Sequence, residues 1–231
     1  MTIKLNGSTA GSVALDAPAQ TTGNADIAFK LPIADGSANQ LLKTDGSGNL
    51  GWASDTGTIL QVANSTYNGQ DSLALTTAYS NNDNAIYYVT QLDTTLTTTR
   101  ANSKILISGM ISGEFNEPDH VFGFIISSTI GGTTAPIDAL RGTSTNNRLK
   151  ISFMPSIGYH GDNNGSTPAS TPFSNLYYAP NQAAGTAITI RLGVVTTYYS
   201  NKTFKVNQAI DGTNNDEHEH LLSHMTLMEI A

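Results

Sequence analysis

Apolar and polar residues alternate in short segments along the chain, and turn-forming residues separate these segments. In the first part, residues 13–17 and 27–31 alternate most clearly, between turns such as Asp35-Gly36 and Asp45-Gly46. A period of two places alternate side chains on one face of a strand, and Asp-Gly and Asn-Gly favour tight hairpin turns. The chain has no sustained apolar stripe with a period of 3.6 residues, so we expect many strands and little helix.

From about residue 58 the alternating segments become longer. Ile105, Ile107 and Ile111 fall on one face, and so do the four apolar residues at even positions from 188 to 194. Strands at this spacing predict a β-sandwich, with a jelly roll favoured over an immunoglobulin type. We expect the polar stretches Asn64–Asn84 and Gly158–Thr171 to be loops. The predicted strands are Ile59–Val62, Tyr87–Leu92, Lys104–Ser112, Val121–Ser127, Leu149–Met154, Leu176–Tyr178, Ala187–Val195, Thr203–Val206 and Met225–Ile230.

Residues 1–57 contain too few apolar residues to form an independent core. Folded segments of this size usually need a metal, disulfides or oligomerisation for stability. Cysteine is absent and no metal-ligand set is obvious, so oligomerisation is the remaining route. We therefore divide the chain into an N-terminal oligomerising arm or shaft, residues 1–57, and a C-terminal sandwich, residues 58–231.

The composition excludes several classes of protein. Apolar residues make up 39% and charged residues only 13%, and such low charge argues against disorder. The net charge of −7 gives no attraction to nucleic acid or anionic membrane surfaces. The chain begins without the pattern of a signal peptide and has no apolar run of about 20 residues. We expect synthesis in the host cytoplasm and no membrane insertion.

Three stretches of the sequence carry a resemblance to a known family. They are GSVALDAP at 11–18 with the alternating segment after it, DGSANQLLKTDGSGNLGW at 35–52, and TLMEIA at 226–231. Together they resemble proteins of marine tailed bacteriophages, above all cyanophages. The resemblance implies a trimeric tail-fibre or virion-surface fibre protein, in which a short N-terminal module attaches to other virion proteins and a β-rich C-terminal domain faces the host.

A trimer also suits the N-terminal alternation. Three chains that each contribute one apolar face can close a prism, and this closure removes the unpaired edge strands. The expected interior, and hence the trimer interface, consists of Val13, Leu15, Ile27, Phe29 and Leu31.

Two clusters of titratable residues carry candidate chemistry. His218 and His220 lie two residues apart, and on a strand at a three-fold axis three such pairs offer six imidazoles to one metal ion. A solvated acidic turn explains the same residues, and no second ligand cluster supports a site within one chain. Glu117 and Asp119 are the candidate acid and base of a glycan hydrolase, although carboxylates are common in turns.

Pairs of adjacent tyrosines on strands should point one ring into the core and one outward. Candidate contacts with host glycan or with a neighbouring subunit are Tyr88, Tyr159, Tyr178 and Tyr199. The sequence therefore predicts a non-enzymatic virion protein without cofactors, most simply a homotrimeric tail fibre for host attachment. Two alternatives stay open: a capsid decoration protein and a glycan-cleaving tailspike-like hydrolase.

Overall fold

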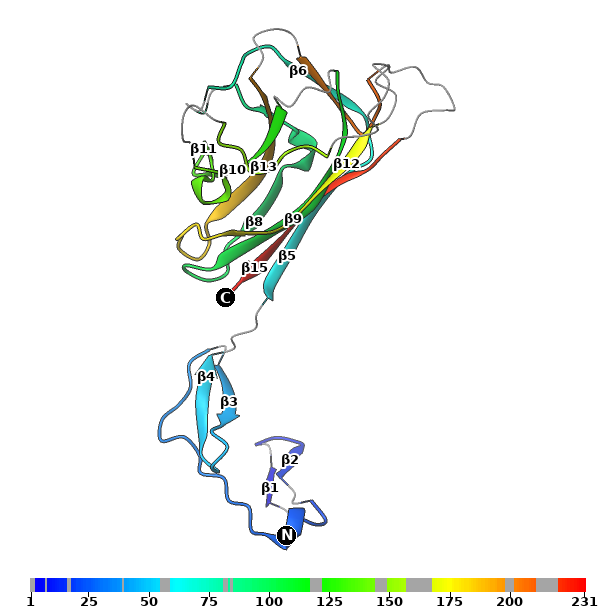
Figure 1. Ribbon diagram of the computed structural model, residues 1–231. Helices are drawn as coiled ribbons and strands as arrows, with labels where there is room; N and C mark the ends of the chain where they lie inside the picture. Colours follow the sequence, from blue (N-terminus) through cyan, green and yellow to red (C-terminus); the bar gives the residue numbers. More distant parts are fainter. Residues whose placement is uncertain are drawn as a thin grey trace. The chain divides into compact units, whose positions relative to one another are not determined.

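The computed structural model forms two compact units, Met1–Thr56 and Gly57–Ala231, each of which is described by itself (Figure 1). It describes residues 3–6, 8–15, 18–38, 40–54, 59–80, 83, 85–116, 122–143, 149–156, 168–197, 202–210 and 220–231. Every ladder between strands is antiparallel. Among the described residues, the helical segments are three single 3₁₀ turns at Thr22–Asn24, Thr90–Leu92 and Asp138–Leu140. The prediction of an all-β protein is confirmed, and no helix in the described part is long and apolar enough to cross a membrane.

The first sheet of the second unit is built around the long strand β9 (Lys104–Phe115). On one edge β9 pairs with β12 (Ala169–Tyr178). On the opposite edge β15 (Ser223–Ile230) and β14 (Lys202–Val206) share β9 end to end, because β15 pairs with residues 104–110 and β14 with residues 113–115. The sheet is completed by β5 (Ile59–Tyr67) beside β15 and β6 (Asp71–Leu75) beside β14.

The second sheet is centred on β13 (Ala187–Thr196). On one edge β13 pairs with β10 (Phe122–Ile130), which in turn pairs with β11 (Thr133–Pro136). Two short strands, β7 (Tyr87–Tyr88) and β8 (Thr94–Thr97), share the other edge of β13. Read across the first sheet, the strand order is β12-β9-β14-β6 at one end of β9 and β12-β9-β15-β5 at the other. The order in the second sheet is β7/β8-β13-β10-β11.

The core lies between these two sheets, as alternation predicts. Ile105, Ile107 and Ile111 of β9 are almost completely buried, and so are the residues at even positions from 188 to 194 on β13. Burying one such side chain stabilises the fold by roughly 1.5–3 kcal/mol. Aromatic rings fill one end of the core, where Phe115 stacks on Phe122 with centroids 4.0 Å apart. The expected inward faces of both strands are confirmed.

A smaller cluster covers the outer face of the second sheet. Tyr79, Ile125 and Val195 are buried there, and Leu149 and Ile151 pack against them. The segment Leu149–Met154 was expected to be a strand, and this expectation is wrong: it contributes only an isolated bridge between Phe153 and Phe124. Leu149 and Ile151 cover the outer sheet face, whereas Phe153 packs against the core between the sheets.

Several predicted boundaries are also wrong. The expected loop Asn64–Asn84 contains the second half of β5 and all of β6. The short polar strands β8 and β11 were not predicted. In Tyr87–Leu92 only the first two residues form a strand, and a 3₁₀ turn follows. Of the other expected loop, residues 158–167 lie outside the described residues, and its end already belongs to β12.

The first unit consists of two short hairpins. One joins β1 (Ile3–Asn6) to β2 (Ser12–Leu15), and the other joins β3 (Gln40–Thr44) to β4 (Leu50–Ser54). Residues 27–31, expected to form an alternating strand, contain only one bridging residue, because Lys30 alone pairs with Asn49. That expectation is wrong: the segment lies beside the start of β4, but its pairing there is limited to the bridge at Lys30.

Candidate functional site

The first unit exposes large apolar side chains instead of burying them. None of its residues whose side chains the structure describes is buried. A two-stranded hairpin has only one partner strand, so its side chains have no second layer to pack against. The exposed large apolar residues of this unit are Ile3, Leu5, Ile27, Phe29, Leu31, Ile33, Leu41, Leu42 and Trp52.

The residues expected at a trimer interface all belong to this exposed region or to its hairpins. Phe29 and Leu31 have 63% and 74% of their surface exposed, and Ile27 has 59%. Val13 and Leu15 lie on β2, where their backbones pair with Leu5 and Ile3 of β1. Within one chain, therefore, Ile27, Phe29 and Leu31 are not collected into a core.

The hairpin between β3 and β4 is held by the carboxylate of Asp45. Its Oδ1 atom accepts hydrogen bonds from the backbone N–H groups of Ser47 (2.7 Å) and Asn49 (3.1 Å). The Asn49 side chain donates a further bond of 2.6 Å to Oδ2. The hydrogen bond from the Asn49 side chain has the largest effect in lowering the pKa of Asp45, and the bond from the Ser47 backbone has the next largest lowering effect. This hairpin is thus ordered by its own turn, independently of any core.

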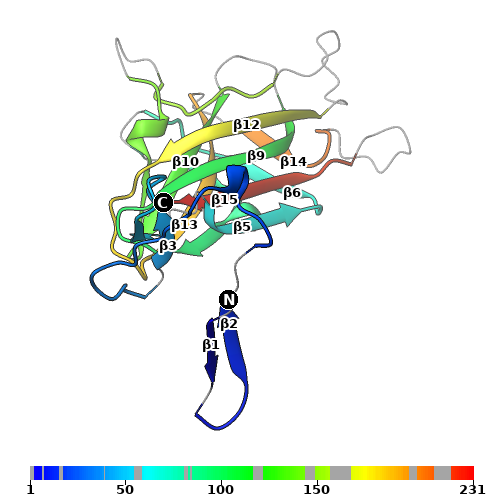
Figure 2. The same cartoon turned by 90° about the horizontal axis from the view of Figure 1, so that it is seen from below.

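A second exposed surface lies on the outer side of the first sheet, where β12, β9, β15 and β5 run side by side (Figure 2). Cross-strand pairing aligns one apolar side chain from each strand into a row. In this row Tyr177 is 47% exposed and Val62 is 57% exposed. We call this surface the β5–β12 face, and its apolar row consists of Tyr177, Leu106, Met228 and Val62.

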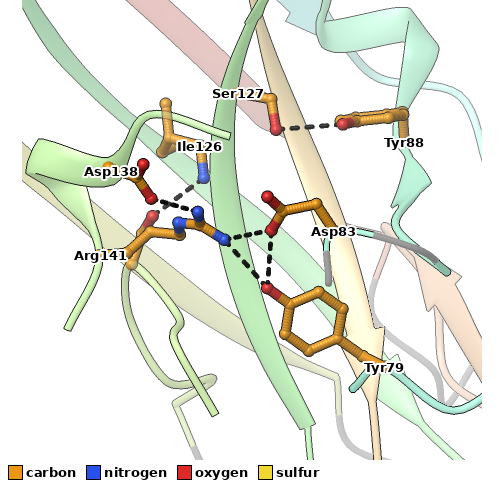
Figure 3. Close-up of polar contacts among 8 residues, drawn as sticks. Tyr79, Asp83, Tyr88, Ile126, Ser127, Asp138 and Arg141 are labelled. Atoms are coloured by element: carbon orange, nitrogen blue, oxygen red, sulfur yellow. Dashed lines mark hydrogen bonds and ion pairs between the residues drawn. The ribbon is translucent and has the colours of Figure 1, made fainter. Parts of the chain in front are cut away.

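The outer side of the second sheet, in contrast, is covered and charged. Figure 3 shows Arg141 at its centre, with Nη1 donating to Asp83 (2.5 Å) and to the Tyr79 hydroxyl (3.0 Å). The other guanidinium nitrogen, Nη2, donates to Asp138. The Arg141 side chain is only 4% exposed, so these bonds hold Tyr79, Asp83 and the turn at Asp138 together over the sheet.

Tyr88 lies on this same outer side. The Arg191 guanidinium lies 4.2 Å from the centre of its ring, and Arg191 also pairs with Asp93 at 3.0 Å. The Tyr88 hydroxyl donates to Ser127 at 3.1 Å (Figure 3). One face of the ring therefore already has a cation against it.

In the pair at the end of β12, the inward ring is that of Tyr178. It packs against the core, and its hydroxyl lies 3.1 Å from that of Ser128. The outward member is Tyr177, whose ring has the Lys104 ammonium 5.6 Å from its centre. Tyr159 and Tyr199 lie outside the described residues.

The remaining predicted site residues do not form a described cluster. His220 is exposed, and its Nδ1 atom lies 3.0 Å from the Gln70 amide nitrogen. His218, Glu117 and Asp119 lie outside the described residues. In the part of the chain that the structure describes, no group of three or more His, Cys, Asp or Glu residues could hold a metal ion.

One buried carboxylate was missed in the sequence. Glu229 of β15 is completely buried and accepts hydrogen bonds from the Ser103 hydroxyl (2.6 Å), the Gln61 amide (2.6 Å) and the Thr99 backbone (2.7 Å). Burial alone would raise its pKa, but these bonds outweigh burial and lower the pKa below the ordinary value of 4.5. The sequence could have predicted this burial, because the period of two places Glu229 on the same face of the strand as Met225 and Leu227.

Comparisons with known proteins give only distant similarities. No protein-family model matches the chain, and no curated protein matches it either. One similar solved structure is that of infectious bursal disease virus, Gx strain, with 13% identity, a TM-score of 0.33, and coverage of 98% of this chain and 45% of that chain. Another is the infectious bursal disease virus VP2 subviral particle, with 13% identity, a TM-score of 0.31, and coverage of 79% and 40%. This chain thus spans less than half the length of either matched chain.

Proposed function

We propose that this chain is a non-enzymatic structural subunit of a virus particle that assembles as a homotrimer through residues 1–57. The observation that carries the proposal is the first unit, which is folded into hairpins yet exposes its large apolar side chains. Contiguous exposed apolar surface marks a protein contact. Trimer contacts through Val13, Leu15, Ile27, Phe29 and Leu31 would give those side chains the second layer that one chain lacks.

The strand order of the second unit supports a jelly roll. Nine strands fill eight positions in two rows of four, β6-β14-β9-β12 and β7/β8-β13-β10-β11, because β7 and β8 share one position. The two further strands, β15 and β5, extend the first sheet beside β9. The chain passes from one sheet to the other between β6 and β7, β8 and β9, and β9 and β10. Jelly rolls recur in viral structural proteins and in lectin domains. This architecture suits a sandwich carried at the exposed end of a virion fibre.

Within this proposal, the N-terminal phrases that resemble cyanophage proteins favour a tail fibre or appendage that docks on other virion proteins and contributes to host attachment. Tyr88 is the described tyrosine that remains a candidate for stacking on a host glycan, since it lies on an outer sheet face and is partly exposed. Labelling the subunit on intact particles distinguishes a tail location from a capsid decoration protein. Sugar release from host polysaccharide that is lost in Glu117→Gln or Asp119→Asn would instead establish the hydrolase.

The oligomer is tested by measuring the mass of the full chain in solution across protein concentrations. We expect a species of three times the 24.4 kDa chain mass, which persists on dilution. The variant Phe29→Asp/Leu31→Asp should dissociate at concentrations where the wild type does not, because charges cannot enter an apolar interface without a large desolvation cost. The matched control, Thr133→Asp/Thr134→Asp on the exposed strand β11, should keep the wild-type mass. A stable folded wild-type monomer overturns the proposal.

A further inference from the structure

We propose that the β5–β12 face is the surface through which the sandwiches of neighbouring copies of this chain contact one another. This inference rests on the proposed function, because it requires copies held together by residues 1–57. It adds a second contact, made by the sandwich itself, and names the residues that form it.

Within the second unit, this face keeps exposed apolar side chains, unlike the outer side of the other sheet. There, Tyr79, Ile86, Leu149 and Ile151 belong to a covering cluster, and Arg141 holds Tyr79 in place. On the β5–β12 face the apolar row remains accessible, with Tyr177 and Val62 about half exposed. A neighbouring row carries the small neutral side chains Ser108, Thr226 and Asn64. An apolar row flanked by hydroxyl and amide groups is the composition of a subunit contact with a dry centre and polar surroundings.

Charge favours a second copy as the occupant. The chain has a net charge of −7, so two copies repel each other wherever both present acidic groups. Along β5, β12, β15 and residues 104–110 of β9, the sole acidic residue is Glu229, and it points into the core. The outer side of the second sheet instead carries Asp83, Asp93 and Asp138. The β5–β12 face is therefore a surface on which identical acidic chains can approach without repulsion between acidic groups, and the charge beside its apolar row is the ammonium of Lys104.

The size of the face fits a contact that depends on the N-terminal module. Four strands of about eight residues cover roughly 19 Å by 27 Å, or about 500 Å². This is below the roughly 800 Å² per partner of a stable interface, so the face alone should bind a second copy weakly. Residues 55–58 join β4 to β5 and span at most about 18 Å. Copies joined through residues 1–57 would thus present this face to one another at an effective concentration on the order of millimolar.

The test uses the absence of cysteine from the chain, which makes an introduced thiol unique. Val62→Cys places the thiol in the apolar row on the edge strand β5, and Ala135→Cys places a control thiol on the exposed edge strand β11. Each is introduced into the full chain, with and without Phe29→Asp/Leu31→Asp, and the rate of maleimide modification is measured together with the mass. In the trimer we expect the thiol at position 62 to react at least about tenfold more slowly than the thiol at position 135. Maleimide reaches position 62 only in the fraction of trimers whose contact through this face is open. In the dissociated variant both thiols should react at the same rate.

The other outcomes separate the two proposals. Equal rates at 62 and 135 in an intact trimer overturn the contact through this face and leave the proposed function standing. Slow modification at 62 in the dissociated variant as well means that the chain's own N-terminal unit covers the face, which overturns the contact between copies. A wild type that is itself a monomer overturns both proposals. Slow modification only in assembled particles assigns the face to a different virion protein and overturns the contact between copies.

Discussion

The two units of this chain contain the same kinds of strands and turns, but the second unit buries its large apolar side chains and the first exposes them. Both contain alternating strands and turns with Gly, Asn and Asp, and both contain a carboxylate whose pKa is lowered by hydrogen bonds, Asp45 in one and Glu229 in the other. In the second unit two sheets face each other, so alternation becomes burial. In the first unit each hairpin lacks a facing sheet, so the same alternation leaves Ile3 and Leu5 of β1 exposed. Alternation thus indicates which side chains share a face, whereas burial requires a partner surface.

The largest expected difference between the units concerns apolar truncation. Ile190→Ala removes a completely buried side chain between the sheets and should lower the free energy of unfolding of the sandwich by about 2–5 kcal/mol. Leu31 is 74% exposed in the first unit, so Leu31→Ala should leave the free energy of unfolding of the sandwich unchanged. Urea denaturation of both variants, followed by a spectroscopic signal from the second unit, measures this difference. A loss of sandwich stability in Leu31→Ala would show that the units are not energetically separate.

A smaller effect is expected at the buried carboxylate. Ser103, Gln61 and Thr99 donate hydrogen bonds to the charged Glu229 carboxylate. Glu229→Gln replaces this carboxylate by a neutral amide and should lower the free energy of unfolding by about 1.5–3 kcal/mol. Because the folded pKa is below 4.5, the carboxylate's contribution is complete above that pH and is lost as the pH falls below it. Acidification from pH 6 to pH 3 should therefore reduce the stability of the wild type more than that of Glu229→Gln. Parallel pH dependences would contradict this role.

The smallest effect is expected at the exposed carboxylate of the first unit. Asp45→Ala removes the acceptor for the Ser47 and Asn49 N–H groups, so their amide hydrogens should exchange faster with solvent. The unfolding midpoint of the sandwich should not move, because this hairpin contributes nothing to its core. Hydrogen exchange and urea denaturation of the same variant test both statements. A shifted midpoint would place the hairpin within the cooperative unit of the sandwich.

The sequence identified the inward faces of β9 and β13 because long strands with a strict period of two leave one choice of face. It could not identify β8, whose Thr-Thr-Leu-Thr contains one large apolar residue and is a strand only because β13 lies beside it. The same limit explains Leu149–Met154, which has strand-forming residues without a ladder partner. Arg141 was beyond prediction, since its partners Asp83 and Tyr79 meet it only in the folded chain. Strand propensity is local, and pairing is decided by distant segments.

The central position of β15 has a consequence for synthesis. β5 opens the sandwich, yet its ladder partner β15 is made roughly 170 residues later, where Ile230 pairs with Ile59. At about 5–20 residues per second, the ribosome needs roughly 10–30 s to supply that partner. Throughout this interval β5 is an unpaired edge on a nascent chain, and nascent chains emerging side by side can pair their β5 strands with the wrong copy. The sandwich can therefore be completed only after residue 230 has been made, and the yield of correctly folded chains should depend on how far apart the chains are during this interval.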